Sequence, residues 1–279
     1  MKNSIIFLSI FISISVFSQS PWTQEKGKFY TQLSFTSIAN YNTLFASPEK
    51  KINGNITDNT IQFYGEYGLS DKTTFIVNIP LKLISHKDIA VFCVGFPCNP
   101  IDNNKTALGN VEIGIKHNFS KKDWLLSGQL NIETNTSNFD AFTGIRTGYN
   151  AFTFTPLFLA GKGYSKSYIQ TFIGANIRTN NYSSNFKIGG EYGRKLGNSF
   201  WLIGYLDIVK SFKNGNITLP NSNLTTGLFV NDQEYGGFGF KGIYEINNKF
   251  GVNAGFGGAF FANNLAKAPA LSFGLYHKF

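Results

Sequence analysis

Charged residues are scarce in this chain of 279 residues, where they make up 15% of the total, against roughly 25% in an ordinary soluble protein. Long apolar runs are scarce as well, since no segment after residue 18 is continuous and apolar enough for a membrane-spanning helix. The mean hydropathy of −0.09 agrees with that absence. The chain is instead rich in aromatic residues, with 29 Phe and 13 Tyr, and it has 29 Gly. This composition favours a sheet with one apolar face and one polar face.

The first 18 residues have the pattern of a cleaved secretory signal. Lys2 gives a basic start, the run from Ile5 to Phe17 is apolar apart from serines, and Ser18 is a small residue before a cleavage point at Gln19. The run is shorter than the about 20 apolar residues that a membrane-spanning helix needs. A Gln at position 19, where a lipoprotein would have Cys, argues against a lipid anchor. We therefore predict a signal peptide over residues 1–18 and a single domain over residues 19–279.

Apolar and polar residues alternate through most of the remaining chain. In Asn110–Phe119 the apolar side chains of Val111, Ile113 and Ile115 stand at every second position. A period of two indicates a β-strand with two unlike faces. The same pattern predicts about twelve strands, at 28–39, 58–69, 73–83, 107–119, 124–133, 150–161, 167–178, 185–196, 200–211, 234–246, 250–260 and 269–279. The face that points inward is ambiguous around Ala151–Leu159 and Tyr168–Ile177.

The links between these strands alternate in length. Short polar links lie at 70–72, 121–123, 162–166, 197–198 and 247–249, and long ones at 40–57, 84–106, 134–149 and 212–233. Short turns at one rim and long loops at the other, with an even number of strands, are typical of an outer-membrane barrel. A soluble sandwich would bury its Phe-rich face, whereas a barrel of this size leaves that face against lipid. We therefore predict an all-β, antiparallel transmembrane β-barrel of about 12 strands in the outer membrane of a Gram-negative bacterium, with short periplasmic turns and long outer loops.

Two stretches of the chain resemble known outer-membrane proteins. The carboxy-terminal segment 271–279 is similar to the last strand that such proteins present to the barrel-assembly machinery, with Gly274, His277 and Phe279 as the signal. The stretches Tyr64–Lys72, with Asn78-Ile79-Pro80 after it, and Ala107–Lys116 resemble the outer-membrane transporters associated with the phenol meta-cleavage pathway and their uncharacterised relatives. The first resemblance implies the assembly machinery as a partner. The second implies a transport role and, more weakly, aromatic substrates.

Strand parity places charged side chains of both signs inside the barrel. The predicted lumen residues are Glu66, Lys82, Glu112, Lys116, Glu133, Lys187, Glu191, Lys195, Asp207, Lys241 and Glu245. One interpretation is that opposite charges pair across neighbouring strands and fill a narrow barrel, since buried charges normally occur in pairs. The other is a polar path that selects small solutes. A barrel of about twelve strands is wider than a side-chain-packed barrel of eight strands and narrower than a porin of sixteen.

The few cysteines and histidines give no sign of a metal or catalytic site. Cys93 and Cys98 lie in one long loop, and in a secreted chain they are expected to form a disulfide. His86 alone would not complete a metal site with them, and His117 and His277 are expected at the membrane interface rather than as catalytic bases. We predict no enzyme activity, no cofactor and no metal.

The net charge of +9 could suggest a nucleic-acid partner. Lysines lie on the short turns, however, among them Lys121, Lys122, Lys162, Lys166 and Lys249, and no basic cluster is interleaved with stacking aromatics. We predict no nucleic-acid binding.

The sequence thus favours an outer-membrane channel or transporter for passive movement of small molecules, with hydrophobic or aromatic ones suggested by the resemblance. The alternative is a structural barrel with a closed lumen and outer loops that bind a partner. An outer-membrane enzyme ranks third, and the solute itself stays unspecified.

Overall fold

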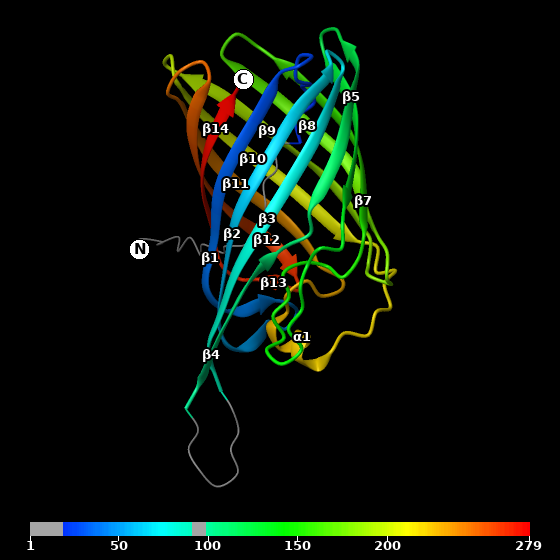
Figure 1. Ribbon diagram of the computed structural model, residues 1–279, viewed down its shortest axis with the longest axis vertical. Coiled ribbons are helices and arrows are strands. Elements are labelled where there is room, and N and C mark those ends of the chain that lie inside the picture. Colours follow the sequence, from blue (N-terminus) through cyan, green and yellow to red (C-terminus); the bar gives the residue numbers. More distant parts are fainter. Residues whose placement is uncertain (1–18, 91–98) are drawn as a thin grey trace, which may run out of the picture.

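The computed structural model describes residues 19–90 and 99–279, so the predicted signal peptide and both cysteines lie outside the described residues. The strands are β1 (Phe29–Phe45), β2 (Lys50–Ser70), β3 (Thr73–Ile89), β4 (Ile101–Leu108), β5 (Glu112–Lys121), β6 (Leu125–Glu133), β7 (Thr153–Gly163), β8 (Ser167–Arg178), β9 (Asn185–Leu196), β10 (Phe200–Ser211), β11 (Glu234–Glu245), β12 (Phe250–Asn263), β13 (Leu265–Ala266) and β14 (Ala270–Lys278). One short helix, α1 (Asn221–Thr226), precedes β11 (Figure 1). Among the described residues, no helix has the length and apolar character needed to cross a membrane.

The described strands form one closed antiparallel barrel of twelve. β1 closes the wall by pairing with both β2 and β14, with Tyr30 opposite Lys278 and Ile38 opposite Ala270 in the second seam. β4 and β5 share one position in the wall because both pair with β3, and β13 adds a two-residue pairing to the end of β1. The prediction of an antiparallel all-β barrel of about twelve strands is confirmed.

The two faces of each strand differ in polarity as the alternation predicted. On β14 the outward side chains of Leu271, Phe273 and Leu275 are exposed, whereas Ala270 and Tyr276 on the other face are buried. Large apolar side chains are exposed in the same way on strands all around the barrel. An apolar outer surface of this extent is stable only against an apolar medium, which is the condition that a lipid bilayer provides.

Two segments that the sequence suggested as loops are largely strand. Most of 40–57 extends β1 and β2, which turn only at residues 46–49. Residues 84–89 pair with 101–105 as the outer parts of β3 and β4. The pattern was hidden because register shifts follow Ile38 and His86, next to Asn40 and Asp88, whose φ angles are positive. Each shift moves the apolar side chains to the opposite parity. The predicted strand 107–119 is likewise divided, into β4 and β5.

The ambiguous parity around Ala151–Leu159 is resolved by burial. Thr155, Leu157 and Leu159 face the lumen and are buried, whereas Phe154 and Phe158 face outward. Both faces of β7 are apolar near its end because protein fills the lumen there. Pro21 lies against this part of β7, so closely that a Cβ placed on Gly161 would lie 2.6 Å from Cγ of Pro21. The lumen-facing residues of β7 at this point contact protein rather than water, and apolar side chains are therefore favoured there.

The two ends of the barrel are unlike. Figure 1 shows the carboxy terminus at the end with the short turns, and α1 with the long loops at the opposite end, where β4 runs out along β2 and β3 beyond the rim. These are called the short-turn end and the long-loop end below.

Candidate functional site in the barrel lumen

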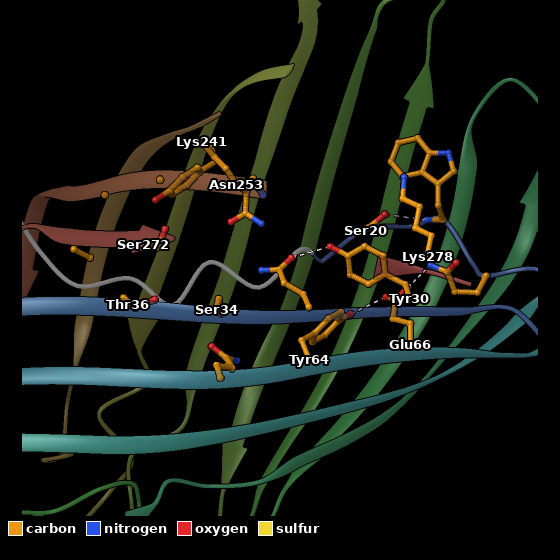
Figure 2. A pocket seen from close by; sticks show the side chains of 18 residues that line it. Ser20, Tyr30, Ser34, Thr36, Tyr64, Glu66, Lys241, Asn253, Ser272 and Lys278 are labelled. Atoms are coloured by element: carbon orange, nitrogen blue, oxygen red, sulfur yellow. Dashed lines mark hydrogen bonds between the residues drawn. The ribbon is translucent and has the colours of Figure 1, made fainter. Parts of the chain in front are cut away.

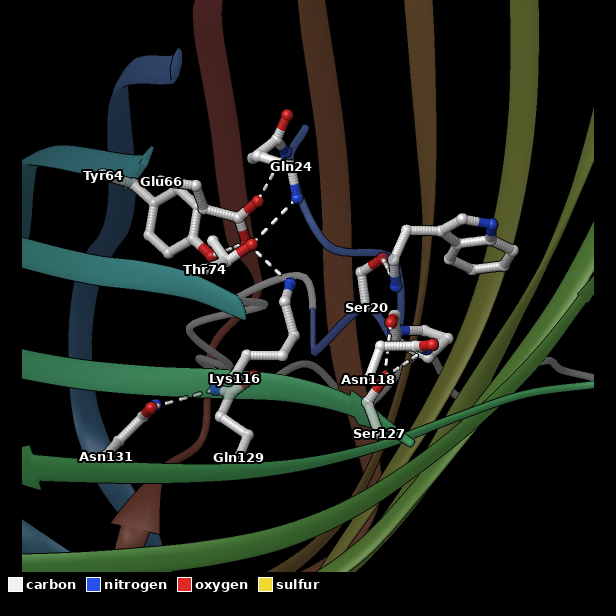
Figure 3. Close-up of polar contacts among 12 residues, drawn as sticks. Ser20, Gln24, Tyr64, Glu66, Thr74, Lys116, Asn118, Ser127, Gln129 and Asn131 are labelled. Carbon is white, nitrogen blue, oxygen red and sulfur yellow. Dashed lines mark hydrogen bonds and ion pairs between the residues drawn. The ribbon is translucent and has the colours of Figure 1, made fainter. Parts of the chain in front are cut away.

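The segment of residues 19–28, called the N-terminal segment below, runs inside the barrel from the short-turn end (Figure 3). The backbone N–H of Gln24 donates to Oγ1 of Thr74 at 2.8 Å, and its side-chain Nε2 donates to Oε2 of Glu66 at 2.7 Å. Further along, the Ser127 hydroxyl donates to the Pro21 carbonyl at 2.6 Å. The segment is thus hydrogen-bonded to two parts of the same side of the wall, at β2–β3 and at β6, with β5 between them.

A buried ion pair holds the wall beneath this segment. Lys116 Nζ lies 2.9 Å from Oε1 of Glu66, and the two side chains are 1% and 7% exposed. The same carboxylate accepts a hydrogen bond from the Tyr64 hydroxyl at 2.7 Å. With Gln24 as a third donor, the charge of Glu66 is fully compensated within the protein.

A polar recess of about 300 Å³ lies between the N-terminal segment and the wall formed by β1, β2, β11, β12 and β14. Its lining combines hydroxyl, amide and small side chains with the charged Glu66, Lys241 and Lys278. Figure 2 shows Ser34, Thr36 and Ser272 on neighbouring strands of this wall, with Asn253 and Lys241 beside them. We call this cavity the polar recess.

A second cavity, of about 270 Å³, extends across the lumen from β5 and β6 to β9 and β10 and has charged side chains of both signs. Glu112 and Glu133 are directly opposite each other on β5 and β6, with Lys187 and Arg178 as the cations of the same cavity. An adjoining space of about 60 Å³ is lined by Gln19, Lys187, Glu191 and Asp207. We call the larger space the central cavity.

The short-turn end opens into a vestibule of about 520 Å³ whose aromatic lining is entirely Tyr and Trp, although Phe is the commonest aromatic of the chain. Its rings are Trp22, Tyr30, Tyr164, Tyr168, Trp201 and Tyr276. The Tyr168 ring centroid lies 5.8 Å from that of Trp22 and 5.7 Å from that of Trp201. The vestibule therefore presents a row of ring faces with polar edges.

The long-loop end is covered by a cap, which we define as residues 134–152 and 212–233. Ile145 and Leu228 of the cap are buried against Ile56 and Ile84 of the wall in one apolar cluster. Within the cap, the Arg146 guanidinium donates through Nε to Oδ1 of Asn223 at 2.9 Å. The cap is a packed, hydrogen-bonded structure rather than a set of separate loops.

The eleven charged residues predicted for the lumen all lie on this inner face. Eight line the cavities just described: Glu66, Glu112, Glu133, Lys187, Glu191, Asp207, Lys241 and Glu245. The other three, Lys82, Lys116 and Lys195, form ion pairs with Asp58, Glu66 and Glu245. Whether any of them selects a solute stays a prediction.

The pairing differs from the expectation of contacts across neighbouring strands. Lys82 and Asp58 lie on adjacent strands, but Lys116 on β5 reaches Glu66 on β2 across β3, and Lys195 on β9 reaches β11 across β10. Barrel strands are tilted and staggered, so side chains at the same height are set on strands two apart as well as on neighbours. A long lysine side chain spans that separation.

Sequence reasoning missed the N-terminal segment and Asp58. Asp58 has the same parity as Glu66 in its predicted strand and could have been included. Residues 19–28 have neither alternation nor a helical pattern, and nothing in their sequence indicates that they lie inside the barrel.

The predicted assembly residues lie at the closing seam. The His277 ring stacks on Phe250, with 4.0 Å between ring centroids, and the Phe279 backbone N–H donates to the Phe29 carbonyl at 2.9 Å. Gly274 faces the lumen, where a Cβ would lie 3.0 Å from the Asn253 amide. Their recognition by the assembly machinery stays a prediction.

Neither a family model nor a curated protein matches the chain, but several solved structures do. An outer membrane channel from Pseudomonas putida F1 aligns over 95% of this chain and 100% of its own, with a TM-score of 0.68 and 11% identity. The NanC porin aligns over 90% and 100%, with a TM-score of 0.53 and 6% identity. The translocator domain of the autotransporter NalP from Neisseria meningitidis aligns over 92% and 90%, with a TM-score of 0.52 and 11% identity. At these identities the similarity concerns the fold, and it confirms a β-barrel of the outer-membrane type.

Proposed function

We propose that the chain is an outer-membrane channel through which small molecules move passively. The observation that carries this proposal is the series of polar cavities inside a barrel whose outer surface is apolar. The vestibule shares Ser20, Trp22 and Lys278 with the polar recess, and the small space beside Gln19 shares Lys187 with the central cavity. The cavities therefore adjoin one another from the short-turn end to the base of the cap, and this series supports a path for water and small polar solutes.

The side chains that line the cavities indicate which class of solute each cavity suits. The recess and the central cavity are lined mainly by polar and charged groups, which supports polar solutes. Only the vestibule offers ring faces suited to the hydrophobic or aromatic molecules that the sequence resemblance suggested. We propose a polar solute for the inner cavities, and aromatic solutes stay a prediction that rests on the vestibule.

Passage of a solute requires that the cap and the N-terminal segment move, because both lie across the lumen. The cap joins the barrel wall at four points, the ends of β6 and β10 and the starts of β7 and β11, and the N-terminal segment joins it at one, the start of β1. Movement of either would leave the pairing between the wall strands intact. Opening at the cap would expose the apolar cluster of Ile145 and Leu228. Displacing the N-terminal segment would break its hydrogen bonds with the wall, among them those of Gln24 with Thr74 and Glu66 and that of Ser127 with Pro21.

Swelling of proteoliposomes tests the proposal. Vesicles that contain the purified chain are diluted into isosmotic arabinose, glucose or sucrose, and uptake of labelled benzoate is measured in parallel, with protein-free vesicles as the control. We expect faster swelling in arabinose than in sucrose, because the cavities are small. Swelling no faster than that of protein-free vesicles for every sugar, without benzoate uptake, would contradict a channel.

The second candidate function is a structural barrel with a closed lumen whose outer surface binds a partner. The packing of the cap favours it, because Asn223 is fully buried and is hydrogen-bonded to both Arg146 and the Leu228 carbonyl. A barrel without solute flux, before and after removal of the cap hydrogen bond by Asn223→Ala, would support this candidate over the channel.

A further inference from the structure

The lumen wall of the polar recess is made of unusually small residues. On β12 the inward positions include Gly255 and Gly257, and on β14 they include Ser272 and Gly274. A Cβ on Gly255 would lie 2.7 Å from Oγ of Ser272, and one on Gly257 would lie 2.7 Å from the Tyr205 hydroxyl. Real Cβ atoms do not approach other atoms so closely, so a larger residue would not fit at these positions without a shift of its neighbours. The glycines therefore leave this part of the wall without side chains. The recess is thus a consequence of the sequence of this wall.

Polar side chains border this bare wall in two neighbouring rows. Thr36 is opposite Ser272, which is opposite Gly255, which is opposite Lys241. In the next row Ser34 and Asn253 are both opposite Gly274. Five polar side chains from four strands therefore converge on one cavity of about 300 Å³ (Figure 2).

These five side chains have no partner within the described part of the protein. None of the hydroxyls of Ser34, Thr36 and Ser272, the Asn253 amide and the Lys241 ammonium makes a hydrogen bond or an ion pair with another described residue. Lys82, Lys116 and Lys195 are paired with carboxylates, Lys187 shares its cavities with Glu112, Glu133 and Asp207, and Lys278 lies over the Tyr276 ring. The carboxylate of the recess, Glu66, is already engaged by Lys116. Lys241 is therefore a half-buried cation that lacks a counter-ion.

The hydrogen-bond donors and acceptors of the recess define the chemistry of a ligand that would fit it. The second lysine of the lining, Lys278, lies at the vestibule end of the recess, with its ammonium over the Tyr276 ring. Beside the four neutral polar side chains Lys241 is therefore the one ammonium, and its three donors balance one negative charge. The recess has no arginine fork and no helix N-terminus, the groups that proteins use for a doubly charged phosphate. The surrounding hydroxyls and amide donate and accept hydrogen bonds, which suits a ligand with several hydroxyl groups. A volume of about 300 Å³ is at the lower end for ligand sites.

We propose that the polar recess binds a small polyhydroxylated monocarboxylate, of the size of a six-carbon sugar acid. Its carboxylate lies on the Lys241 ammonium, and its hydroxyls contact Ser34, Thr36, Asn253 and Ser272. The proposal deepens the channel function, since it rests on the recess being part of the solute path and names the class of solute that this part of the path retains.

Isothermal titration calorimetry of the purified full chain in detergent tests the site, with D-gluconate as the probe. Sorbitol has the hydroxyls without the charge, and hexanoate has the charge without the hydroxyls. We expect gluconate to bind at least about tenfold more tightly than either probe. Sorbitol lacks the charged hydrogen bond with Lys241, and hexanoate leaves the hydroxyls and the amide of the recess without partners. Equal binding of the three probes, or no binding of gluconate, would overturn the proposal.

Two variants assign the site. Lys241→Gln is expected to weaken gluconate binding about tenfold or more, whereas Lys210→Gln, which removes a lysine paired with Glu234 outside the recess, is expected to leave it unchanged. Gly255→Leu fills the recess and is expected to abolish binding. The heat-modified mobility of the barrel on a gel verifies that each variant is folded. Unchanged binding in folded Lys241→Gln would overturn the assignment.

The outcomes separate this inference from the channel function. Calorimetry measures equilibrium binding and needs no flux. Sugar flux without gluconate binding would overturn the inference and leave the channel standing. Gluconate binding without any flux would support the recess and count against the channel.

Discussion

The buried pair of Lys116 and Glu66 is the interaction whose removal the structure predicts most sharply. Lys116→Met removes the ammonium and keeps a side chain of similar length. The Glu66 carboxylate, 7% exposed, then retains only its hydrogen bonds from Gln24 and Tyr64. Removing one partner of a buried pair typically destabilises a protein by about 3–5 kcal/mol, because the other charge stays buried and uncompensated. We expect a loss of that size in the free energy of unfolding.

The double variant Lys116→Met/Glu66→Met leaves neither charge. Replacement of a whole buried pair by apolar residues is often close to neutral, so the double variant is expected to be more stable than Lys116→Met alone. The recovery is incomplete because Gln24 and Tyr64 lose their common acceptor.

Urea unfolding in lipid vesicles, followed by tryptophan fluorescence, measures these differences. The matched control is Lys267→Met, since Lys267 pairs with Glu49 at the surface, with side chains 29% and 52% exposed. Exposed pairs contribute at most about 1 kcal/mol. A loss for Lys116→Met no larger than for Lys267→Met would refute the account of this pair.

Three further predictions concern the outer face, the long-loop end and the N-terminal segment. Phe273→Lys is expected to lower the unfolding free energy by about 2–4 kcal/mol if that position is near the bilayer midplane, whereas Ser272→Lys on the lumen face is tolerated; equal losses would contradict the assignment of faces. Burial lowers the pKa of His86, and its Nδ1 has no hydrogen-bond partner among the described residues, so the folded form prefers the neutral ring. The outer parts of β2 and β3 are therefore expected to be most stable above the ordinary histidine pKa of about 6.5 and to become less stable as the pH falls below it. Amide hydrogen exchange there, corrected for intrinsic rates, is expected to be faster at pH 5 than at pH 7.5. Exchange that does not depend on pH, or that has the same pH dependence in His86→Gln, would contradict this. Trp22→Ala removes the contact with Tyr168 and is expected to raise solute flux, whereas Trp124→Ala on an exposed turn is not; equal flux in both would show that the N-terminal segment does not restrict the lumen.

The strands were predictable where one face meets lipid and the other meets polar groups. β8, β9 and β10 begin and end at the residues that alternation predicts. The pattern failed where a bulge reverses parity, as at Asn40, and where the strand leaves the membrane, because a hairpin wetted on both sides needs no apolar face.

The site was predictable only as a set of inward positions. Parity placed Lys241 and Glu66 on the inner face, but which charges lack a partner depends on the stagger between strands that are distant in sequence. The pair Lys116–Glu66 is 50 residues apart in the chain, and neither strand contains a signal for the other. The N-terminal segment was missed for a similar reason, since its contacts with Ser127 and Thr74 are set by the closed barrel.

Single-channel recording in a planar lipid bilayer tests the central claim most directly. The purified chain is expected to give discrete conductance steps, smaller than those of a sixteen-stranded porin because its lumen contains the N-terminal segment and the cap. Steps that increase in Trp22→Ala would identify the lumen as the conducting path. Folded protein that inserts into the bilayer without any current, both as wild type and as Trp22→Ala, would contradict the channel.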